Sequence, residues 1–578
     1  MNWEAFKFIK MKSHGSEGVC YHSYSRSHRC EYAIIKKARA KIENDGIHYC
    51  FIRELAALKQ LSHPGICELI KINLASSKLH LFFPYIEMTL QDALKTCQHI
   101  PKLNANRYLG QLLDAIDYCH CRGIVHRNLK PKHILFIPGN GDNIFDGATL
   151  KLADFAYVRM MPCPYEYSTR VITLWYRCPE ILLGKKDYTS AVDVWSAGCI
   201  YAEMLQGYPL FAGLSEIDQL FKIFSKLGTP TDQDWAEFAG LPHYQDNLFP
   251  SFEGSKLEIM SDIRDEEMAI LEKCFRYDCT KRASAAHLLS SHGLLLGVDT
   301  DNNNDLDNDL DNNACDRTTT RQYSFLYHLD MKSDARNSSR EATVSAAERL
   351  TLVEWLTTVM HSFRDDIDFH ERTVFFSVAM FDKYLAAVAA EAGNASHSHN
   401  IRLIGATCLL IASKCEDVSF ITFNHLAERS MDSELDDQSM LLMEERILNC
   451  LDFDVYIPTV VDFLSIFLSY LRESDLIEAM KPFTSYLAEA TLIYNDFTSP
   501  KKSILAAAII CYTQDVFATS SWPIELENLT HFQRHQLQDL YIDIKNMHTN
   551  LYTKANSVIY ERFLDSERCQ VSLIKPLP

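Results

Sequence analysis

Residues that could handle a phosphate group gather near the start of this chain. Gly15 and Gly18 lie in K-S-H-G-S-E-G-V-C, residues 12–20, and glycines let backbone N–H groups approach phosphates closely. Lys36 ends the strand-like run Y-A-I-I-K, and Glu54 follows in a helix-like run. A surface Lys–Glu pair alone is worth only about 0–1 kcal/mol. The order of these residues along the chain therefore matters more than any single pair.

A second stretch, residues 126–135, reads H-R-N-L-K-P-K-H-I-L. The amide of Asn128 cannot accept a proton at neutral pH. The imidazole of His133 suits Zn, Cu or Ni better than Mg²⁺. Proton transfer in this stretch therefore depends on Asn128, and its choice of metal depends on His133.

The elements that position these residues can be read from hydrophobic spacing. Residues 1–86 read as short strands plus one helix, and the C-terminal part as consecutive amphipathic helices with apolar residues three and four apart. At 578 residues, two to four cores are expected. The net charge of -19 argues against a nucleic-acid-binding surface. The 18 scattered cysteines suit buried thiols in a reducing compartment, and no uninterrupted apolar stretch reaches the ~18 residues of a membrane span.

Four short motifs follow one another in the first half of the chain: F-I-R-E (51–54), L-S-H-P-G-I (61–66), K-L-A-D-F-A (151–156) and V-I-T-L-W-Y-R-C-P-E (171–180). Their order resembles that of cyclin-dependent protein kinases, and the resemblance covers about residues 3–292. The resemblance implies the two-lobed, α+β protein-kinase fold. It also implies ATP and Mg²⁺ as cofactors and Ser or Thr before Pro as the phosphorylated sequence.

The resemblance assigns site residues one by one. Asn128 stands at the position of the catalytic Asp, with Lys130 and Thr173 beside it, and Asp154 and His133 stand at the metal-ligand positions. Nucleotide contacts fall on Ser13, Gly15, Gly18, Cys20, Ile34, Lys36, Glu54, Phe83, Pro84, Ile86 and Leu135.

Several of these positions depart from the family pattern. Besides Asn128 and His133, Ala156 replaces the Gly of the D-F-G turn, and Ile34 replaces a small Ala above the adenine. General-base assistance is worth about 10²–10⁴ in rate, so the loss at position 128 need not abolish turnover by itself. Together the departures predict slow or absent phosphoryl transfer and poor ATP binding.

The regulatory positions look better preserved. Arg53, Arg127 and Arg159 match the basic cluster that receives an activating phosphate, whose acceptor falls on Ser168, with Thr169 next to it. The inhibitory tyrosine of the Gly-rich loop is replaced by Glu17, while Ser16 remains at the neighbouring position.

The second half, about residues 335–562, resembles mitotic-type cyclins, an all-α fold of two five-helix repeats. E-R-L-T-L-V-E-W-L (348–356) and L-I-A-S-K-C-E-D (410–417) carry much of this resemblance. It implies that Lys414 and Glu444 contact the kinase helix around Glu54, and that Arg349 and Asp382 form an ion pair within the first repeat.

These resemblances predict an order of segments: a kinase N-lobe (1–86), a kinase C-lobe (87–296), an unstructured acidic linker (297–338), an N-terminal cyclin box (339–457), a C-terminal cyclin box (458–562) and a tail (563–578). Residues 299–316 are rich in Asp and Asn, a composition typical of disorder. Such a tether would keep the two parts at about millimolar effective concentration.

Three functions remain open from the sequence. The first is a pseudokinase scaffold or decoy in cell-cycle regulation, in the nucleus or cytoplasm, whose partners are its own cyclin domain and protein substrates or regulators. The second is an active Ser/Thr kinase with atypical residues, activated by its fused cyclin. The third is a cyclin that activates a separate kinase in trans. No nucleic acid and no membrane are expected as partners.

Overall fold

The computed structural model describes two compact units. Unit 1 comprises residues 1–39, 53–73 and 78–322, and unit 2 comprises residues 40–52, 74–77 and 323–578. The structure describes residues 6–15, 18–25, 32–38, 46–75, 78–97, 99–141, 143–160, 167–168, 172–245, 248–253, 263–293, 307–332, 344–363, 367, 369–392, 400–430, 435–471, 474–494, 497, 500–519, 522–554, 558–564 and 570–577.

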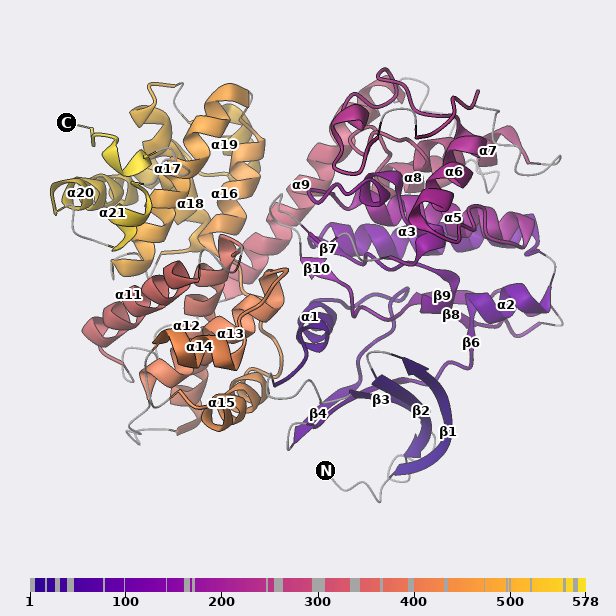
Figure 1. Cartoon of the computed structure of the whole chain (residues 1–578), viewed down its shortest axis with the longest axis horizontal. Coiled ribbons are helices and arrows are strands. Elements are labelled where there is room, and N and C mark those ends of the chain that lie inside the picture. The colour runs from indigo at the N-terminus through magenta and orange to yellow at the C-terminus, as the bar shows by residue number, and fades with distance from the viewer. Residues whose placement is uncertain are drawn as a thin grey trace. The chain divides into compact units, whose positions relative to one another are not determined.

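The first part of unit 1 is built around a five-stranded sheet in the order β1-β2-β3-β5-β4. Figure 1 labels β1, β2, β3 and β4 of this sheet. Its strands are β1 (Phe6–Gly15), β2 (Gly18–Ser25), β3 (Tyr32–Ala38), β4 (Lys71–Ala75) and β5 (Lys78–Pro84), and helix α1 (Tyr49–Leu58) lies between β3 and β4 in the chain. The β1–β2, β2–β3 and β3–β5 pairs are antiparallel.

The rest of unit 1 is mainly helical. It contains α2 (Leu90–Thr96), α3 (Lys102–His120), α4 (Pro179–Leu182), α5 (Ala191–Gln206), α6 (Glu216–Leu227), α7 (Asp265–Cys274) and α8 (Ala285–His292). The short strands are β6 (Met88–Thr89), β7 (Ile124–Val125), β8 (Ile134–Ile137), β9 (Thr149–Leu152) and β10 (Arg159–Met160), and the 3-10 turns are η2 (Pro131–His133), η3 (Leu174–Tyr176) and η4 (Phe238–Gly240). Sheet β6-β8-β9 and pair β10-β7 flank the stretch from 126 to 133.

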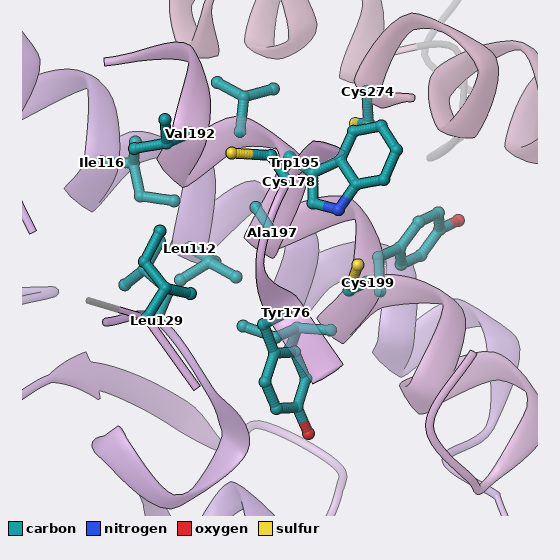
Figure 2. Packing of buried hydrophobic residues seen from close by; sticks show 14 of the residues in the cluster. Leu112, Ile116, Leu129, Tyr176, Cys178, Val192, Trp195, Ala197, Cys199 and Cys274 are labelled. Atoms are coloured by element: carbon teal, nitrogen blue, oxygen red, sulfur yellow. The ribbon is translucent and has the colours of Figure 1, made fainter. Parts of the chain in front are cut away.

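Helix α5 forms the centre of the unit 1 core. Every residue from Val192 to Gln206 is buried, and Trp195 packs edge-on against Phe275 with ring centroids 5.0 Å apart. Figure 2 shows this core, where Trp195 and Cys199 of α5 share one apolar cluster with Leu112 and Ile116 of α3. A core this well packed fixes the first turn of α5, where Asp193 lies.

From residue 323 onwards, the secondary-structure elements of the described part of unit 2 are helices (Figure 1). A first set of helices comprises α11 (Ala346–Ser362), α12 (Arg372–Ala392), α13 (Ile401–Glu416), α14 (Phe423–Ser430) and α15 (Asp437–Cys450). A second set comprises α16 (Val460–Ser469), α17 (Ser474–Ile493), α18 (Lys502–Val516), α19 (Ile524–Thr530) and α20 (Gln538–Lys554), followed by α21 (Val558–Arg562) and η10 (Val571–Leu573); η8 (Arg534–Leu537) precedes α20.

Helix α12 is the one described helix that is long and apolar enough to cross a membrane. Its window Arg372–Ala390 has a mean hydropathy of 1.4, and 67% of that window is buried inside the protein. A buried helix at the centre of a helical domain has the same composition, so length and hydropathy do not indicate a membrane span here.

The expectation of an unstructured linker is wrong for residues 307–332. They form helix α9 (Asp307–Lys332), and Tyr323, Leu326 and Asp330 on its C-terminal part are buried. These three residues are three and four positions apart, so they share one helix face. Burial of that face supplies the stability that the polar first half of the helix lacks.

Candidate functional site

The backbone of the catalytic-loop stretch is held by Asp193 of α5. Its two carboxylate oxygens accept hydrogen bonds from the N–H groups of His126 and Arg127, each at 2.8 Å. His120 Nε2 lies 3.1 Å from the same carboxylate. Arg127 has φ +61°, an unfavourable conformation for a side chain other than glycine, and the carboxylate compensates for it.

The ionisation of Asp193 follows from these contacts. Burial opposes its charge, but the hydrogen bond and positive field of His120, together with His126, hold the pKa of Asp193 below its usual value. Burial also lowers the pKa of the His126 ring. The loop is therefore fixed around a charged carboxylate inside the core.

Asn128, Thr173 and Lys130 form one hydrogen-bonded chain. The Thr173 hydroxyl donates to Asn128 Oδ1 at 3.3 Å, and Lys130 Nζ donates to Thr173 Oγ1 at 2.8 Å. An Asn carboxamide oxygen accepts hydrogen bonds as a carboxylate oxygen does, but it takes no proton at neutral pH. The three predicted catalytic positions are brought together, while the group for proton transfer is absent.

His133 lies between the catalytic loop and Asp154. Its Nδ1 is 3.0 Å from the backbone carbonyl oxygen of Asn128, and its Nε2 is 3.2 Å from Asp154 Oδ2. Burial lowers the pKa of His133 to about 3, although the charge of Asp154 acts in the opposite direction. Asp154 itself has φ +66°. The two predicted metal-ligand positions therefore contact each other directly.

The strands align the predicted nucleotide residues by register. Ser13 pairs with Cys20, Cys20 with Lys36, and Ile34 with Phe83. The side chains of Ser13, Ile34 and Lys36, and all of Ser16, lie outside the described residues, and Gly15 and Gly18 are described only as strand backbone, so the Lys36–Glu54 pair stays a prediction. Glu54 is buried on α1. Cys20, Phe83, Pro84, Ile86 and Leu135 are half-buried.

A ring stack joins β2 to the segment after β5, which the sequence did not predict. The His22 and Tyr85 rings lie with centroids 3.6 Å apart and an interplanar angle of 3°. Tyr85 lies between the predicted nucleotide contacts Pro84 and Ile86, so this stack adjoins the predicted nucleotide pocket. Two aromatic rings more than 60 positions apart give no periodic signal in the sequence.

Tyr188 joins the basic cluster to the segment that carries the predicted phosphate acceptor Ser168. Arg127 Nη1 donates to Tyr188 Oη at 2.7 Å, and the Tyr188 hydroxyl donates to the backbone oxygen of Ser168 at 2.9 Å. Burial raises the pKa of Tyr188, while the charges of Arg127 and Arg159 oppose this. Arg53 is half-buried in α1, and Thr169 lies outside the described residues. The sequence did not identify Tyr188, because the tyrosine is 61 positions from Arg127.

The turn before η3 carries a feature relevant to substrate choice. Ile172 has φ +61°, and its carbonyl oxygen accepts from Arg177 Nη2 at 2.9 Å and from Nε at 3.3 Å. Arg177 also pairs with Glu216 of α6 at 2.5 Å. The carbonyl is thus used inside the protein and cannot accept an N–H from a bound peptide. A proline, which has no N–H, loses nothing opposite such a carbonyl.

The predicted contact residues of unit 2 form two charged groups. Lys414 Nζ and Glu444 Oε1 are 2.7 Å apart and almost fully buried, and the N–H of Ile47, also in unit 2, donates to Glu444 Oε2 at 2.9 Å. Arg349 contacts Asp382 through two nitrogens at 3.1 and 3.0 Å. The structure thus contains the predicted Arg349–Asp382 ion pair. Lys414 and Glu444 pair with each other, and their contact with the helix around Glu54 stays a prediction.

A second buried arginine in unit 2 was not predicted. Arg372, which is 0% exposed, donates to Asp462 Oδ1 at 2.7 Å and pairs with Glu416. Its Nη2 also donates to the carbonyl oxygen of Ile457 at 2.9 Å. This group ties the start of α12 to the start of α16, and the sequence signal was an arginine just before the apolar run that begins at Val374.

Three segments of the chain match known domain families. Residues 10–293 match the protein kinase domain, residues 321–456 the cyclin N-terminal domain, and residues 458–577 the cyclin C-terminal domain. The chain is 37% identical over 288 residues to the protein named cell division control protein 2 homolog 3 of Trypanosoma brucei brucei. The matched region covers 49% of this chain and 89% of that protein. This chain is a cyclin-dependent-type protein kinase fused to a cyclin. The matched cyclin segment begins at 321, inside α9, and so includes part of the segment expected to be linker.

Protein kinases generally bind ATP and Mg²⁺, and Asp154 and His133 stand at the two metal-ligand positions of this kinase–cyclin chain. A carboxylate at Asp154 suits Mg²⁺, which takes oxygen ligands. One partner of Asp154 is an imidazole nitrogen of His133, 3.2 Å away. The donor pair formed by His133 and Asp154 does not fit Mg²⁺.

Proposed function

We propose that this kinase–cyclin chain is a pseudokinase in cell-cycle-type regulation, in which the kinase fold presents binding surfaces and phosphoryl transfer is slow or absent. The observation that carries the proposal is the hydrogen bond from Thr173 to the carboxamide oxygen of Asn128 at 3.3 Å. The site is assembled, but the residue facing the substrate hydroxyl cannot take its proton.

Two further observations support this function. The contact between His133 and Asp154 puts a nitrogen ligand where Mg²⁺ chemistry needs oxygen. Asp193 holds the backbone of the same loop with two 2.8 Å hydrogen bonds. Interactions that maintain shape are thus present, while the residues at two of the positions that would perform chemistry, 128 and 133, are replaced.

A second candidate function is an active kinase directed to Ser or Thr before Pro. It is favoured by the Lys130–Thr173 hydrogen bond at 2.8 Å, and by the internal use of the Ile172 carbonyl. Both features would also serve a pseudokinase that binds Ser/Thr-Pro segments without modifying them. Turnover, not binding, separates the two functions.

The deciding experiment measures phosphate transfer from radiolabelled ATP to a Ser-Pro peptide by the native chain and by the double variant Asn128→Asp, His133→Asn. We expect the variant to exceed the native protein by about 10² or more, the lower end of the value of general-base assistance. A native rate within about tenfold of the variant's rate, abolished by Lys36→Ala, would establish the active kinase instead. The Lys36→Ala control excludes a contaminating kinase.

A thermal-shift titration with Mg·ATP complements the turnover assay. A ligand that binds only the folded state stabilises it by mass action, so an unchanged melting temperature indicates no ATP binding. We expect little or no shift for the native chain and a larger one for the double variant. A cyclin acting in trans would appear in a pull-down as a separate kinase bound to residues 321–577.

A further inference from the structure

The guanidinium of Arg127 has hydrogen-bond acceptors inside the protein. Its Nε donates to the backbone oxygen of Tyr157 at 2.8 Å, and its Nη1 donates to Tyr188 Oη at 2.7 Å. Arg127 is buried, and a buried donor without an acceptor costs free energy. By resemblance, this arginine belongs to the basic cluster that receives an activating phosphate. Two of its nitrogens therefore already have acceptors of another kind.

Tyr188 carries this contact on to the segment that contains Ser168. Its hydroxyl accepts from Arg127 and donates to the backbone oxygen of Ser168 at 2.9 Å. Burial raises the pKa of Tyr188, so the hydroxyl keeps its proton at neutral pH and can donate it. Because the bond uses the backbone of residue 168, it does not require a phosphate on the serine side chain.

Tyr167 holds the same segment by further contacts. Its N–H donates to the backbone oxygen of Lys186 at 2.9 Å. Its buried ring lies with its centroid 5.3 Å from that of Tyr188. Arg127 Cζ is 6.0 Å from the centroid of the Tyr167 ring, at the outer limit of a cation–π contact. Neighbouring residues 167 and 168 are thus both attached to the stretch 186–188.

The contact series from Arg127 through Tyr188 to Ser168, here called the tyrosine tether, is anchored on the core of unit 1. Asp193 in the first turn of α5 accepts from the backbone N–H of Arg127 at 2.8 Å. Tyr188 itself lies shortly before α5, which begins at Ala191. Since α5 is buried along its length, the tether fixes Ser168 relative to a well-packed helix.

We propose that Tyr188 takes the place of an activating phosphate, so that the segment carrying Ser168 is docked on Arg127 in the unphosphorylated chain. A phosphate usually orders such a segment through new arginine contacts. Here the hydrogen bonds of 2.7 and 2.9 Å in series already bring the guanidinium close to residue 168. A phosphate on Ser168 would therefore replace an existing contact and add little order.

This inference deepens the proposed function and rests on it for its use. A kinase fold that presents binding surfaces without turnover keeps them in place if the segment needs no phosphate. The tether itself consists of contacts that do not involve Asn128 or any other group proposed to have lost its chemistry. Its presence can therefore be tested without measuring phosphate transfer.

The test measures amide hydrogen exchange by mass spectrometry in peptides of the full-length chain that contain Tyr167 and Ser168. The native chain and Tyr188→Phe are each prepared with serine and with genetically encoded phosphoserine at position 168, and intact mass verifies the phosphate content. In the native chain, phosphoserine should change exchange by less than about threefold, the effect of a weak hydrogen bond. This native pair decides the central claim without any substitution.

Tyr188→Phe keeps the buried ring and removes only the hydroxyl of the tether. With serine at 168, its exchange should be faster by about tenfold or more, because a hydrogen bond to a charged group has that effect on a local opening equilibrium. Phosphoserine should then restore most of the protection, because the phosphate can bind the released guanidinium. Unchanged exchange in α5 shows that the variant is folded.

The matched control is Tyr208→Phe, which removes the hydroxyl of an exposed tyrosine in the same unit and should leave exchange unchanged. Three results would overturn the proposal: phosphoserine slows exchange tenfold or more in the native chain, Tyr188→Phe with serine exchanges as the native chain does, or phosphoserine restores no protection in Tyr188→Phe. A fast native kinase would instead overturn the proposed function and leave the exchange results to decide the tether.

Discussion

Two buried aspartates show how individual residues set local chemistry. Asp193 and Asp417 are each 1% exposed. The histidines and backbone N–H groups around Asp193 outweigh its burial, so its pKa lies below the usual value. Asp417 accepts from the His370 N–H at 2.8 Å and the Thr373 hydroxyl at 2.7 Å. Burial dominates there and raises its pKa to about 7. The first carboxylate holds the catalytic loop as an anion. The second belongs to the C-cap residue of α13, contacts the residues that begin α12, and has a pKa close to neutral pH.

Asp417 makes unit 2 less stable as pH rises. Because its folded pKa of about 7 lies above its ordinary value of 3.8, the folded state binds the extra proton between these two values. Between these two values the free energy of unfolding therefore falls by up to about 1.4 kcal/mol per pH unit, and it levels off above pH 7. In Asp417→Asn this dependence disappears, so its melting temperature relative to the native chain should rise from pH 5 to 7.

The measurement is thermal unfolding of the full-length chain at several pH values, with Asp232→Asn, at an exposed position, as control. A constant difference between Asp417→Asn and the native chain across that range would contradict the assignment. So would a difference that shrinks as the pH is raised.

At the scale of elements, the C-terminal end of helix α9 caps the start of helix α18. Its residue Asp330 accepts from the N–H groups of Lys502 and Ser503 at 3.2 and 3.0 Å and from the Ser503 hydroxyl at 2.8 Å. The N-cap residue of α18, Lys501, provides no side-chain cap. Its ammonium instead donates to the carbonyl oxygens of Asp330 and Met331. The end of α9 thus accepts hydrogen bonds from the first N–H groups of α18, and Lys501 in turn donates to the last carbonyl oxygens of α9.

Removal of this cap should destabilise unit 2. We expect Asp330→Ala to lower the free energy of unfolding by about 1–2 kcal/mol, as loss of an N-cap does. Hydrogen exchange should increase at the first turn of α18, which can be followed by mass spectrometry. Asp543→Ala, at an exposed position, is the matched control, and equal exchange in the two variants would contradict the role of Asp330.

At the scale of the whole molecule, the folded units do not coincide with the matched domains. Residues 40–52 lie inside the matched protein kinase domain but belong to unit 2. There the Ile47 N–H donates to Glu444, and Gly46 has φ +70° at a point where an added Cβ would collide with Glu444 Oε2. One glycine therefore allows the backbone to approach the buried Lys414–Glu444 pair. A single chain keeps this segment at high effective concentration.

Loss of Glu444 should release this segment. Glu444→Ala leaves the buried ammonium of Lys414 without its carboxylate, which costs about 3–5 kcal/mol, and it frees the Ile47 N–H. We expect faster hydrogen exchange in peptides covering residues 46–52 and a lower melting temperature. Glu444→Gln, which keeps an acceptor oxygen, should show a smaller effect on exchange. Glu428→Ala on the exposed side of α14 should show none, and unchanged exchange in Glu444→Ala would contradict the contact.

Much of the architecture could be predicted from the sequence. The order of short motifs such as K-L-A-D-F-A and L-I-A-S-K-C-E-D predicted a kinase followed by a cyclin, and the domain families confirm both. It also placed Asn128, Lys130 and Thr173 in one group. The misassigned segment was α9, because its Asp- and Asn-rich first half hides a buried face that begins at Tyr323.

The sequence by itself determined which residue types occupy each site position, because motif spacing is a local property of the chain. Only the tertiary structure decided that His133 bridges the Asn128 carbonyl and Asp154, that Tyr188 connects Arg127 to Ser168, and that Asp330 caps α18. These contacts join residues from separate elements, and close packing of the helices sets their distances. The loss of a proton acceptor at position 128 and the imidazole at position 133 are therefore visible in the sequence, and the contacts that these two residues make follow only from the fold.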